Sequence, residues 1–230
     1  MSTPSLDKRA FYSQPDVSDA YDRQRFGGAS GARVNAREVE IVLRLLPPEG
    51  RVLDLACGTG RIAQAIAARS QRVVGLDYSP PMAAKTAQLG VPTAIGDGFA
   101  TPFPDDAFDA VISIRFAFHY VELLPLLREM RRVARPGASC VLDTYSWSPR
   151  AALALGARSW GGRVRLHGRR EMTTAAAAAG LRIEQIEPCF LFSPYVYRLV
   201  PLPVERTFES LERVVPPSWL CRIFWKLTVD

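Results

Sequence analysis

Short apolar blocks and helix-like stretches follow one another along the first two thirds of the chain. Short apolar runs bounded by turn residues are typical of buried strands, whereas apolar residues recurring every three or four positions are typical of helices. The pattern predicts strands over residues 51–55, 72–76, 91–95, 108–114 and 138–144, and helices over 35–46, 61–68, 80–89 and 121–134. This alternation favours a parallel sheet with helices on both faces.

The rhythm loosens after residue 145. A long connection follows, then a predicted helix over 170–179, strands over 181–187 and 190–197, and a helical remainder from about 201. We therefore expect three parts. They are an N-terminal lid segment, a central domain with an acceptor-site insertion at 146–167, and a C-terminal helical extension, at residues 1–34, 35–200 and 201–230.

The composition is that of an ordinary globular domain: 230 residues, 48% hydrophobic and 23% charged. Apolar runs stay short of the roughly 20 residues that a membrane-spanning helix needs. The first thirty residues are polar and do not resemble a secretory signal, so we expect a cytoplasmic protein. The four cysteines lie far apart and form no C-x-x-C pair, which argues against a disulfide framework and leads us to expect no metal.

The net charge of +6 is unevenly distributed. Residues 1–114 hold 12 basic and 13 acidic residues, and residues 115–230 hold 17 and 10. The basic residues are scattered, so a nucleic-acid partner is not favoured. Residues 217–228 mix aromatic and aliphatic residues with Arg222 and Lys226, which suits a helix on a membrane surface, on the domain itself or on the partner of a homodimer.

A glycine-rich turn follows the first predicted strand, in the segment DLACGTG at residues 54–60. Gly58 and Gly60 allow a sharp turn and a close approach of a ligand to the backbone. Residues 58–63 also fit the G-x-G-x-x-G/A pattern of dinucleotide-binding proteins. The glycines alone therefore leave the ligand open.

Acidic residues lie at the ends of three successive predicted strands and narrow the choice of ligand. Asp54 would repel a pyrophosphate but can bind an ammonium group. Asp77 can accept hydrogen bonds from both hydroxyls of a ribose. Asp97 can accept from an adenine amino group, while Phe99 offers the ring an aromatic face. Together they surround a nucleoside in the crevice where doubly wound sheets bind ligands.

These motifs resemble the class I S-adenosylmethionine-dependent methyltransferases of the small single-domain type. The resemblance spans residues 51–145 and also includes FPDDAFD at 103–109 and REMRRVARPG at 128–137. One departure is Ala56, where many members have glycine. The resemblance implies a Rossmann-like, doubly wound sheet of seven mostly parallel strands, the last of them antiparallel. It also implies S-adenosylmethionine as cofactor and S-adenosylhomocysteine as product.

The expected cofactor site combines the motif residues with neighbours that the resemblance suggests. Tyr21 would fold over the cofactor and Arg33 would reach its carboxylate. The full set is Tyr21, Arg33, Asp54, Ala56, Cys57, Gly58, Gly60, Asp77, Tyr78, Met82, Asp97, Gly98, Phe99 and Ile114.

The expected acceptor site lies after the fourth strand, where His119 is a candidate general base and Arg115 a candidate partner for an anionic acceptor. His119 could equally pack against the following helix. Side chains expected against the acceptor are Tyr12, Phe116, Tyr120, Trp147, Trp160 and His167.

The predicted function is methyl transfer to a small organic acceptor, hydrophobic or aromatic. Three alternatives remain open. They are a methyltransferase acting on a lipid or quinone precursor at the membrane surface, a non-catalytic cofactor-binding module, and a nicotinamide-dependent reductase on a related fold.

Overall fold

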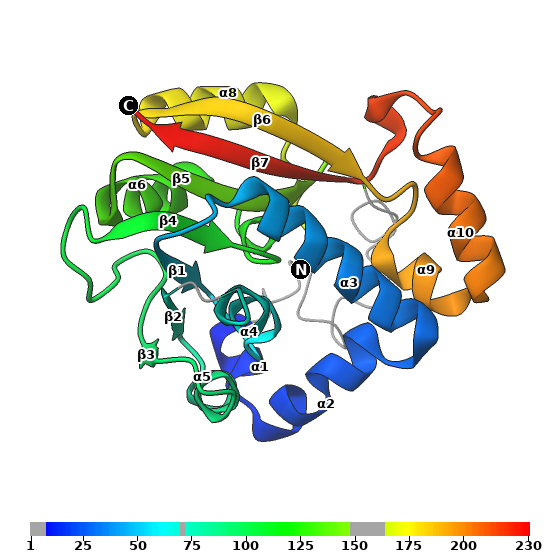
Figure 1. Ribbon diagram of the computed structural model, residues 1–230, viewed down its shortest axis with the longest axis horizontal. Helices are drawn as coiled ribbons and strands as arrows, with labels where there is room; N and C mark the ends of the chain where they lie inside the picture. The colour runs from blue at the N-terminus through cyan, green and yellow to red at the C-terminus, as the bar shows by residue number, and fades with distance from the viewer. Residues whose placement is uncertain (1–7, 70–71, 148–163) are drawn as a thin grey trace, which may run out of the picture.

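One seven-stranded sheet, in the order β3-β2-β1-β4-β5-β7-β6, forms the centre of the molecule (Figure 1). The structure, a computed structural model, describes residues 8–69, 72–147 and 164–230. The strands are β1 (Arg51–Leu55), β2 (Arg72–Asp77), β3 (Thr93–Ile95), β4 (Phe108–Ser113), β5 (Ala134–Tyr145), β6 (Leu181–Cys189) and β7 (Arg222–Val229). β7 runs antiparallel to both of its neighbours, which confirms the predicted Rossmann-like sheet.

Helices cover both faces of the sheet (Figure 1). One hydrophobic cluster joins the strands to α3 and α4, and a second joins them to α6 and α8. The helical elements are α1 (Lys8–Tyr12), α2 (Pro15–Phe26), α3 (Gly28–Leu45), α4 (Arg61–Ala67), α5 (Pro80–Gln88), η1 (Ala117–His119), α6 (Leu124–Val133), α8 (Arg169–Ala178), α9 (Pro194–Leu199), α10 (Leu202–Leu211) and η2 (Pro217–Trp219).

The central strands are buried on both sides, which explains their continuous apolar runs. Val52 of β1 packs in the first cluster and the adjacent Leu53 in the second, since successive side chains of a strand point to opposite faces. The strand order reverses between β1 and β4. Ligands of doubly wound sheets bind in the crevice at the carboxyl ends of the strands beside this point.

The segment 190–197 was predicted to be a strand, and that prediction is wrong. Phe190 has a positive φ of 63°, which ends the extended conformation immediately after β6. Pro194 then begins the helix α9, because proline fits the first turn of a helix. The chain thereby leaves the sheet at this point.

The seventh strand lies in the last residues of the described chain, where we predicted a helical extension. Residues 202–211 do form the helix α10, but residues 222–229 form β7. β7 pairs with β5 on one side and β6 on the other, so its backbone groups are satisfied within the sheet. Phe224 and Trp225 are fully buried there, so residues 222–229 do not form the surface helix that the sequence pattern suggested.

The N-terminal segment is helical. Residues 28–34 belong to α3, which begins at Gly28 and not at residue 35, where the sequence pattern predicted its start. Asn35 instead accepts a hydrogen bond from Arg61 at 2.8 Å. Within the described ranges, no helix is long and apolar enough to span a membrane.

Candidate active site

A cavity opens at the carboxyl ends of β1, β2 and β4, beside the point where the strand order reverses. It encloses about 650 Å³ of space, part of it open to solvent. Four chain segments line it: α1 and α2, the glycine loop, the start of α5, and the loop after β4. The lining residues are Arg9, Tyr12, Tyr21, Ala56, Gly58, Asp77, Tyr78, Ser79, Met82, Ile114, Arg115, Phe116, His119 and Tyr120.

The glycine loop takes three left-handed residues, at Ala56 (φ 62°), Gly58 (φ 58°) and Gly60 (φ 83°). A Cβ on Gly60 would lie 2.8 Å from the Thr86 hydroxyl oxygen, so this glycine is also required by close packing against α5. Ala56 is therefore more than a neutral departure from the family. Holding its Cβ in the left-handed region costs about 1 kcal/mol or somewhat more.

Asp77 organises the floor of the cavity. One carboxylate oxygen accepts the Gly58 N–H at 2.8 Å, and the other accepts the Ser79 N–H at 2.8 Å. Burial raises the pKa of Asp77, and these backbone hydrogen bonds oppose that rise. Each oxygen keeps capacity for a further donor, as two adjacent ribose hydroxyls would require.

Asp54 is a buried acid with one carboxylate oxygen unsatisfied in the described ranges. It is 2% exposed, and its Oδ2 atom has no hydrogen-bond partner within the part of the chain that the structure describes. Burial raises the pKa of Asp54 to about 7; Asp77 adds to that rise, while Arg61 opposes it. An unpaired buried carboxylate oxygen is uncommon and indicates a missing donor.

Asp97 is engaged by a residue of the N-terminal segment. Arg9 of α1 donates to its Oδ2 atom at 2.6 Å, and the Arg9 guanidinium lies 4.6 Å from the centre of the Tyr78 ring. The Asp97 side chain also accepts the Phe99 N–H at 3.0 Å. Arg9 therefore links two residues expected at the cofactor, although nothing in its polar sequence surroundings pointed to this role.

Several of the residues expected at the cofactor line the cavity: Tyr21, Ala56, Gly58, Asp77, Tyr78, Met82 and Ile114. Others lie behind its wall. The Cys57 thiol is buried against Thr86 at 3.5 Å. Gly98 and Phe99 lie behind Phe116, whose ring centre is 5.6 Å from that of Phe99.

Arg33 does not reach the cavity. Its guanidinium pairs with Glu209 of α10, so the structure gives it a partner other than the cofactor carboxylate proposed from the sequence. Ser79 was not predicted as a site residue but lines the cavity. It caps α5 by accepting the Met82 N–H, and its hydroxyl donates to the Tyr12 carbonyl at 2.8 Å.

His119 lies in the short helix η1 and lines the cavity. Its ring centre is 5.6 Å from that of Tyr12 on α1 and 4.7 Å from that of Phe118. His119 therefore borders the cavity and packs against aromatic residues of α1 and η1, whereas the sequence had left open packing against the following helix.

Arg115 lines the cavity, but its guanidinium donates its hydrogen bonds to the buried Glu38. Its backbone is left-handed (φ 63°), and its N–H donates to Asp143 at 2.5 Å. Its guanidinium donates to both oxygens of Glu38, the shortest contact being 2.6 Å. Since the Glu38 pair occupies this group, the structure does not support the prediction that Arg115 chiefly orients an anionic acceptor.

Glu38 is the centre of a buried charge network that the sequence did not reveal. This fully buried acid of α3 receives hydrogen bonds from Arg61, Arg115 and Arg222. Burial alone would raise the pKa of Glu38, but the three guanidinium groups hold it well below its usual range. Arg222 also pairs with Asp143, so the network joins α3, α4, β5, β7 and the loop after β4.

The predicted acceptor residues divide into two groups. Tyr12, Phe116 and Tyr120 line the cavity, and the rings of Phe116 and Tyr120 lie 4.8 Å apart. His167 instead lies buried behind the cavity wall, where Nδ1 contacts Glu171 at 2.8 Å and Nε2 contacts the Tyr120 carbonyl at 3.0 Å.

Trp147 also lies away from the cavity. Its indole N–H donates to the Trp219 carbonyl at 2.8 Å, and its ring packs against Phe192. Trp160 and most of the expected acceptor-site insertion lie outside the described residues.

The fold and this nucleoside-sized crevice define a Rossmann-like methyltransferase architecture. Geranyl diphosphate C-methyltransferase from Streptomyces coelicolor A3(2) superposes with a TM-score of 0.70 at 18% identity, covering 100% of both chains. The [4+2]-cyclase SpnF also superposes with a TM-score of 0.70, at 16% identity over 100% of this chain and 99% of that one. Likeness at these identities shows the fold alone.

Sequence similarity narrows the class to a family. Residues 53–142 match the family model described as a methyltransferase domain. The demethylmenaquinone methyltransferase of Thermus thermophilus is 37% identical over 149 residues, covering 61% of this chain and 67% of the relative. That of Corynebacterium efficiens is 36% identical over 151 residues, covering 64% and 65%. The chain belongs to the class I S-adenosylmethionine-dependent methyltransferases. It spans no more than about two thirds of the length of these relatives.

Proposed function

We propose that the chain methylates a small hydrophobic acceptor with an aromatic ring of the quinone type. The observation that carries this proposal is the aromatic wall of the cavity, formed by Tyr12, Phe116, His119 and Tyr120. Flat aromatic side chains favour a flat apolar acceptor. The name of the relatives, demethylmenaquinone methyltransferase, supports the same substrate class.

We assign the cofactor contacts to three acids and their neighbours. Asp77 would hold the ribose hydroxyls, Asp54 the ammonium group and Asp97 the adenine amino group. The unmet Oδ2 of Asp54 supports its role, because a bound ammonium would supply the missing donor. Asp97 can accept a hydrogen bond from the adenine amino group in addition to the one from Arg9, since a carboxylate accepts several hydrogen bonds.

S-adenosylmethionine, when bound, supplies a methyl group made electrophilic by a sulfonium sulfur. The acceptor forms the new bond to that methyl carbon while the carbon–sulfur bond breaks and its electron pair remains on sulfur. The chain's contribution is to align the two reactants and to exclude water. Tyr12 and Tyr21, from α1 and α2, border the cavity and suit this role.

His119 is the proposed general base. A hydroxyl or an acidic carbon on the acceptor must lose a proton to become a strong nucleophile, and an imidazole accepts protons near neutral pH. Its position in the cavity wall supports this assignment. Arg115, held by Glu38, is proposed to fix the shape of the wall beside it.

We also propose that α1 and α2 form a lid. Residues 28–34 of the predicted lid segment belong instead to α3, where Val34 packs in the core. Thr59 of the glycine loop donates to Asp22 of α2 at 2.8 Å, and Lys85 of α5 pairs with Asp19 at 2.8 Å. These contacts hold α2 against the cofactor side of the cavity. A lid at this position would close over the bound nucleoside.

Two other functions have less support. A nicotinamide-dependent reductase would place a pyrophosphate at the glycine loop, close to the buried Asp54. The fold alone does not exclude a binding module without transfer activity, since a [4+2]-cyclase has the same fold. The presence of His119 in the cavity wall favours catalysis over binding alone.

Calorimetric titration with S-adenosylhomocysteine and with NADH tests the donor assignment, with Asp77→Ala as the decisive variant. We expect the wild type to bind only the former, and Asp77→Ala to weaken binding by about 1.5–3 kcal/mol, roughly tenfold to 150-fold. Glu49→Ala, at an exposed acid before β1, is the control and should bind normally. Unchanged affinity in Asp77→Ala would place the nucleoside elsewhere.

A further inference from the structure

Exposed apolar side chains are concentrated in one stretch of the molecule. Of the ten large apolar side chains exposed in the described chain, five lie between residues 199 and 219. Leu199 is 79% exposed, Val214 77% and Trp219 60%, with Val204 and Leu211 near 40%. We call this stretch, from Leu199 to Trp219, the α10 surface. Val204 and Leu211 are seven residues apart, so they share one face of α10.

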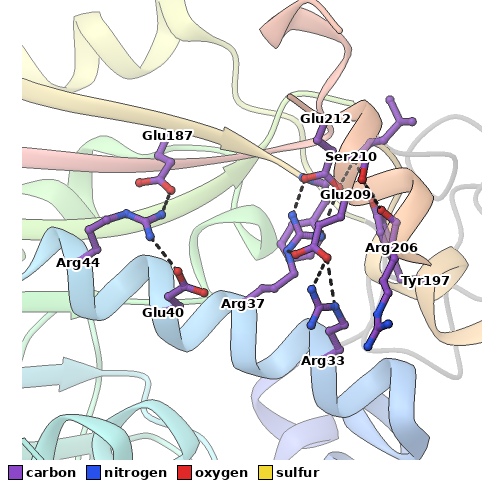
Figure 2. A network of polar contacts seen from close by, with 12 residues as sticks. Arg33, Arg37, Glu40, Arg44, Glu187, Tyr197, Arg206, Glu209, Ser210 and Glu212 are labelled. Carbon is purple, nitrogen blue, oxygen red and sulfur yellow. Dashed lines mark hydrogen bonds and ion pairs between the residues drawn. The ribbon is translucent and has the colours of Figure 1, made fainter. Parts of the chain in front are cut away.

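Glu209 of α10 and Glu212, the residue just after this helix, point toward arginines of α3 (Figure 2). Glu209 pairs with Arg33 of α3, and Glu212 pairs with Arg37 of the same helix. Glu212 also accepts hydrogen bonds from the Tyr197 hydroxyl and the Phe190 N–H. The acidic side chains therefore pin α10 to α3.

The outward charges that remain are basic. Glu205 is buried, and every exposed charged side chain between 199 and 221 is an arginine, namely Arg206 and Arg213. Exposed aliphatic and tryptophan side chains beside cations, with no exposed acid, are the signature of a surface that lies on anionic lipid. An ordinary solvent-facing helix mixes charges of both signs and leaves few large apolar groups exposed.

The α10 surface lies at the end of the sheet that holds the cavity. α9 follows the carboxyl end of β6 after a short turn, and α9, α10 and η2 form the outer wall at that end (Figure 1). The cavity opens at the carboxyl ends of β1, β2 and β4. These strands run parallel to β6, since both β5 and β6 are antiparallel to β7.

We propose that the α10 surface docks this chain reversibly on an anionic membrane. Trp219, Val214 and Leu199 would enter the headgroup layer, while Arg206 and Arg213 contact lipid phosphates. Docking would bring the cavity end of the sheet to the lipid from which a hydrophobic acceptor is drawn. That last step rests on the proposed function; the docking itself does not.

Vesicle co-sedimentation tests the proposal, using phosphatidylcholine vesicles with and without phosphatidylglycerol. We expect binding to the anionic vesicles that declines as salt is raised. Arg206→Ser/Arg213→Ser should weaken it about 25-fold, from roughly 1 kcal/mol per arginine. Val214→Ser/Trp219→Ser should weaken it by more than about tenfold. Ile95→Ser removes an equally exposed apolar side chain on β3 and should leave binding unchanged.

Three results would overturn the docking proposal. The first is the absence of binding to anionic vesicles at low salt, and the second is binding that the α10 variants do not weaken. The third is a dimer in light scattering that Trp219→Ser dissociates, since the surface would then be an interface between two copies. A second assay separates the docking proposal from the proposed function. It measures methyl transfer to a short-chain, water-soluble quinone acceptor in the absence of vesicles. Val214→Ser/Trp219→Ser should leave that rate unchanged, and absence of transfer in the wild type would count against the proposed function alone.

Discussion

Asp54 is a buried acid whose pKa is raised by burial and lowered by a nearby positive charge, Arg61. Its carboxyl group lies in the interior beside Asp77, with one oxygen unpaired among the described residues, and its pKa is raised to about 7. In this state the acid is substantially protonated at neutral pH. A cationic group bound beside it would favour the ionised form and draw the pKa back down.

This linkage predicts pH-dependent cofactor affinity. Because ligand binding lowers the pKa of Asp54, binding below about pH 7 must release a proton. The dissociation constant of S-adenosylhomocysteine should therefore rise by up to about tenfold for each pH unit below 7. Calorimetry at pH 6 and pH 8 measures the effect. Asp54→Asn should bind weakly and show little pH dependence, whereas equal wild-type affinity at both values would argue against the contact.

The two histidines allow a matched comparison of roles. His119→Ala should lower kcat roughly 10²- to 10⁴-fold, as expected for loss of a general base, with little change in cofactor affinity. His167→Ala removes a buried ring that holds Glu171 and the Tyr120 carbonyl, so it should lower the melting temperature. Turnover that survives His119→Ala would identify His119 as a packing residue.

At the scale of elements, α2 is attached to the cofactor loop by a few polar contacts rather than by a core. The hydrogen bond from Thr59 to Asp22 joins it to the glycine loop, and the pair of Lys85 with Asp19 joins it to α5. Among the residues of α2, only Ser18 is buried. Such an element can move without unfolding the domain.

Asp22→Ala tests whether α2 retains the cofactor. Loss of one hydrogen bond of about 1 kcal/mol should speed release of S-adenosylhomocysteine roughly fivefold, measured by stopped flow, with little change in melting temperature. Asp16→Ala, at an exposed acid of the same helix, is the control. Equal release rates in the two variants would mean that α2 is not a lid.

At the scale of the whole molecule, the buried network around Glu38 joins elements far apart in sequence. Glu38 and Asp143 face three arginines, from α4, β7 and the loop after β4. Removing one member of such a network leaves buried charges uncompensated. The network therefore couples the stability of the fold to the shape of the cavity wall.

Glu38→Gln should destabilise the protein by about 3–5 kcal/mol, measured by urea unfolding. The control is Glu40→Gln, at an exposed position of the same helix. The pKa of Glu38 is lowered in the folded state, so its stabilising contribution is full above the ordinary glutamate pKa and is lost as pH falls toward the folded value. The variant should therefore lose less stability than the wild type on acidification; parallel curves would contradict this.

The sequence by itself determined the first five strands and the helices between them, and it singled out Asp54, Asp77 and Asp97 as candidate acids of the donor site. Hydrophobic periodicity, turn glycines and capping residues act over a few neighbouring positions, so β1 and α5 could be predicted nearly to the residue. Ser79, directly before Pro80, caps α5 by accepting the Met82 N–H. Asp77 and Gly58 were placed in the cavity because strand ends converge at a known edge of the sheet.

Only the tertiary structure decided which segment completes the sheet and which partners the arginines take. An apolar and basic segment such as 222–229 suits a surface helix as well as a strand, and pairing with β5 and β6 makes the choice. Arg33, Arg115 and Arg9 each meet an acid more than 70 residues away in sequence. Such contacts depend on which elements pack together, and no local pattern contains that information.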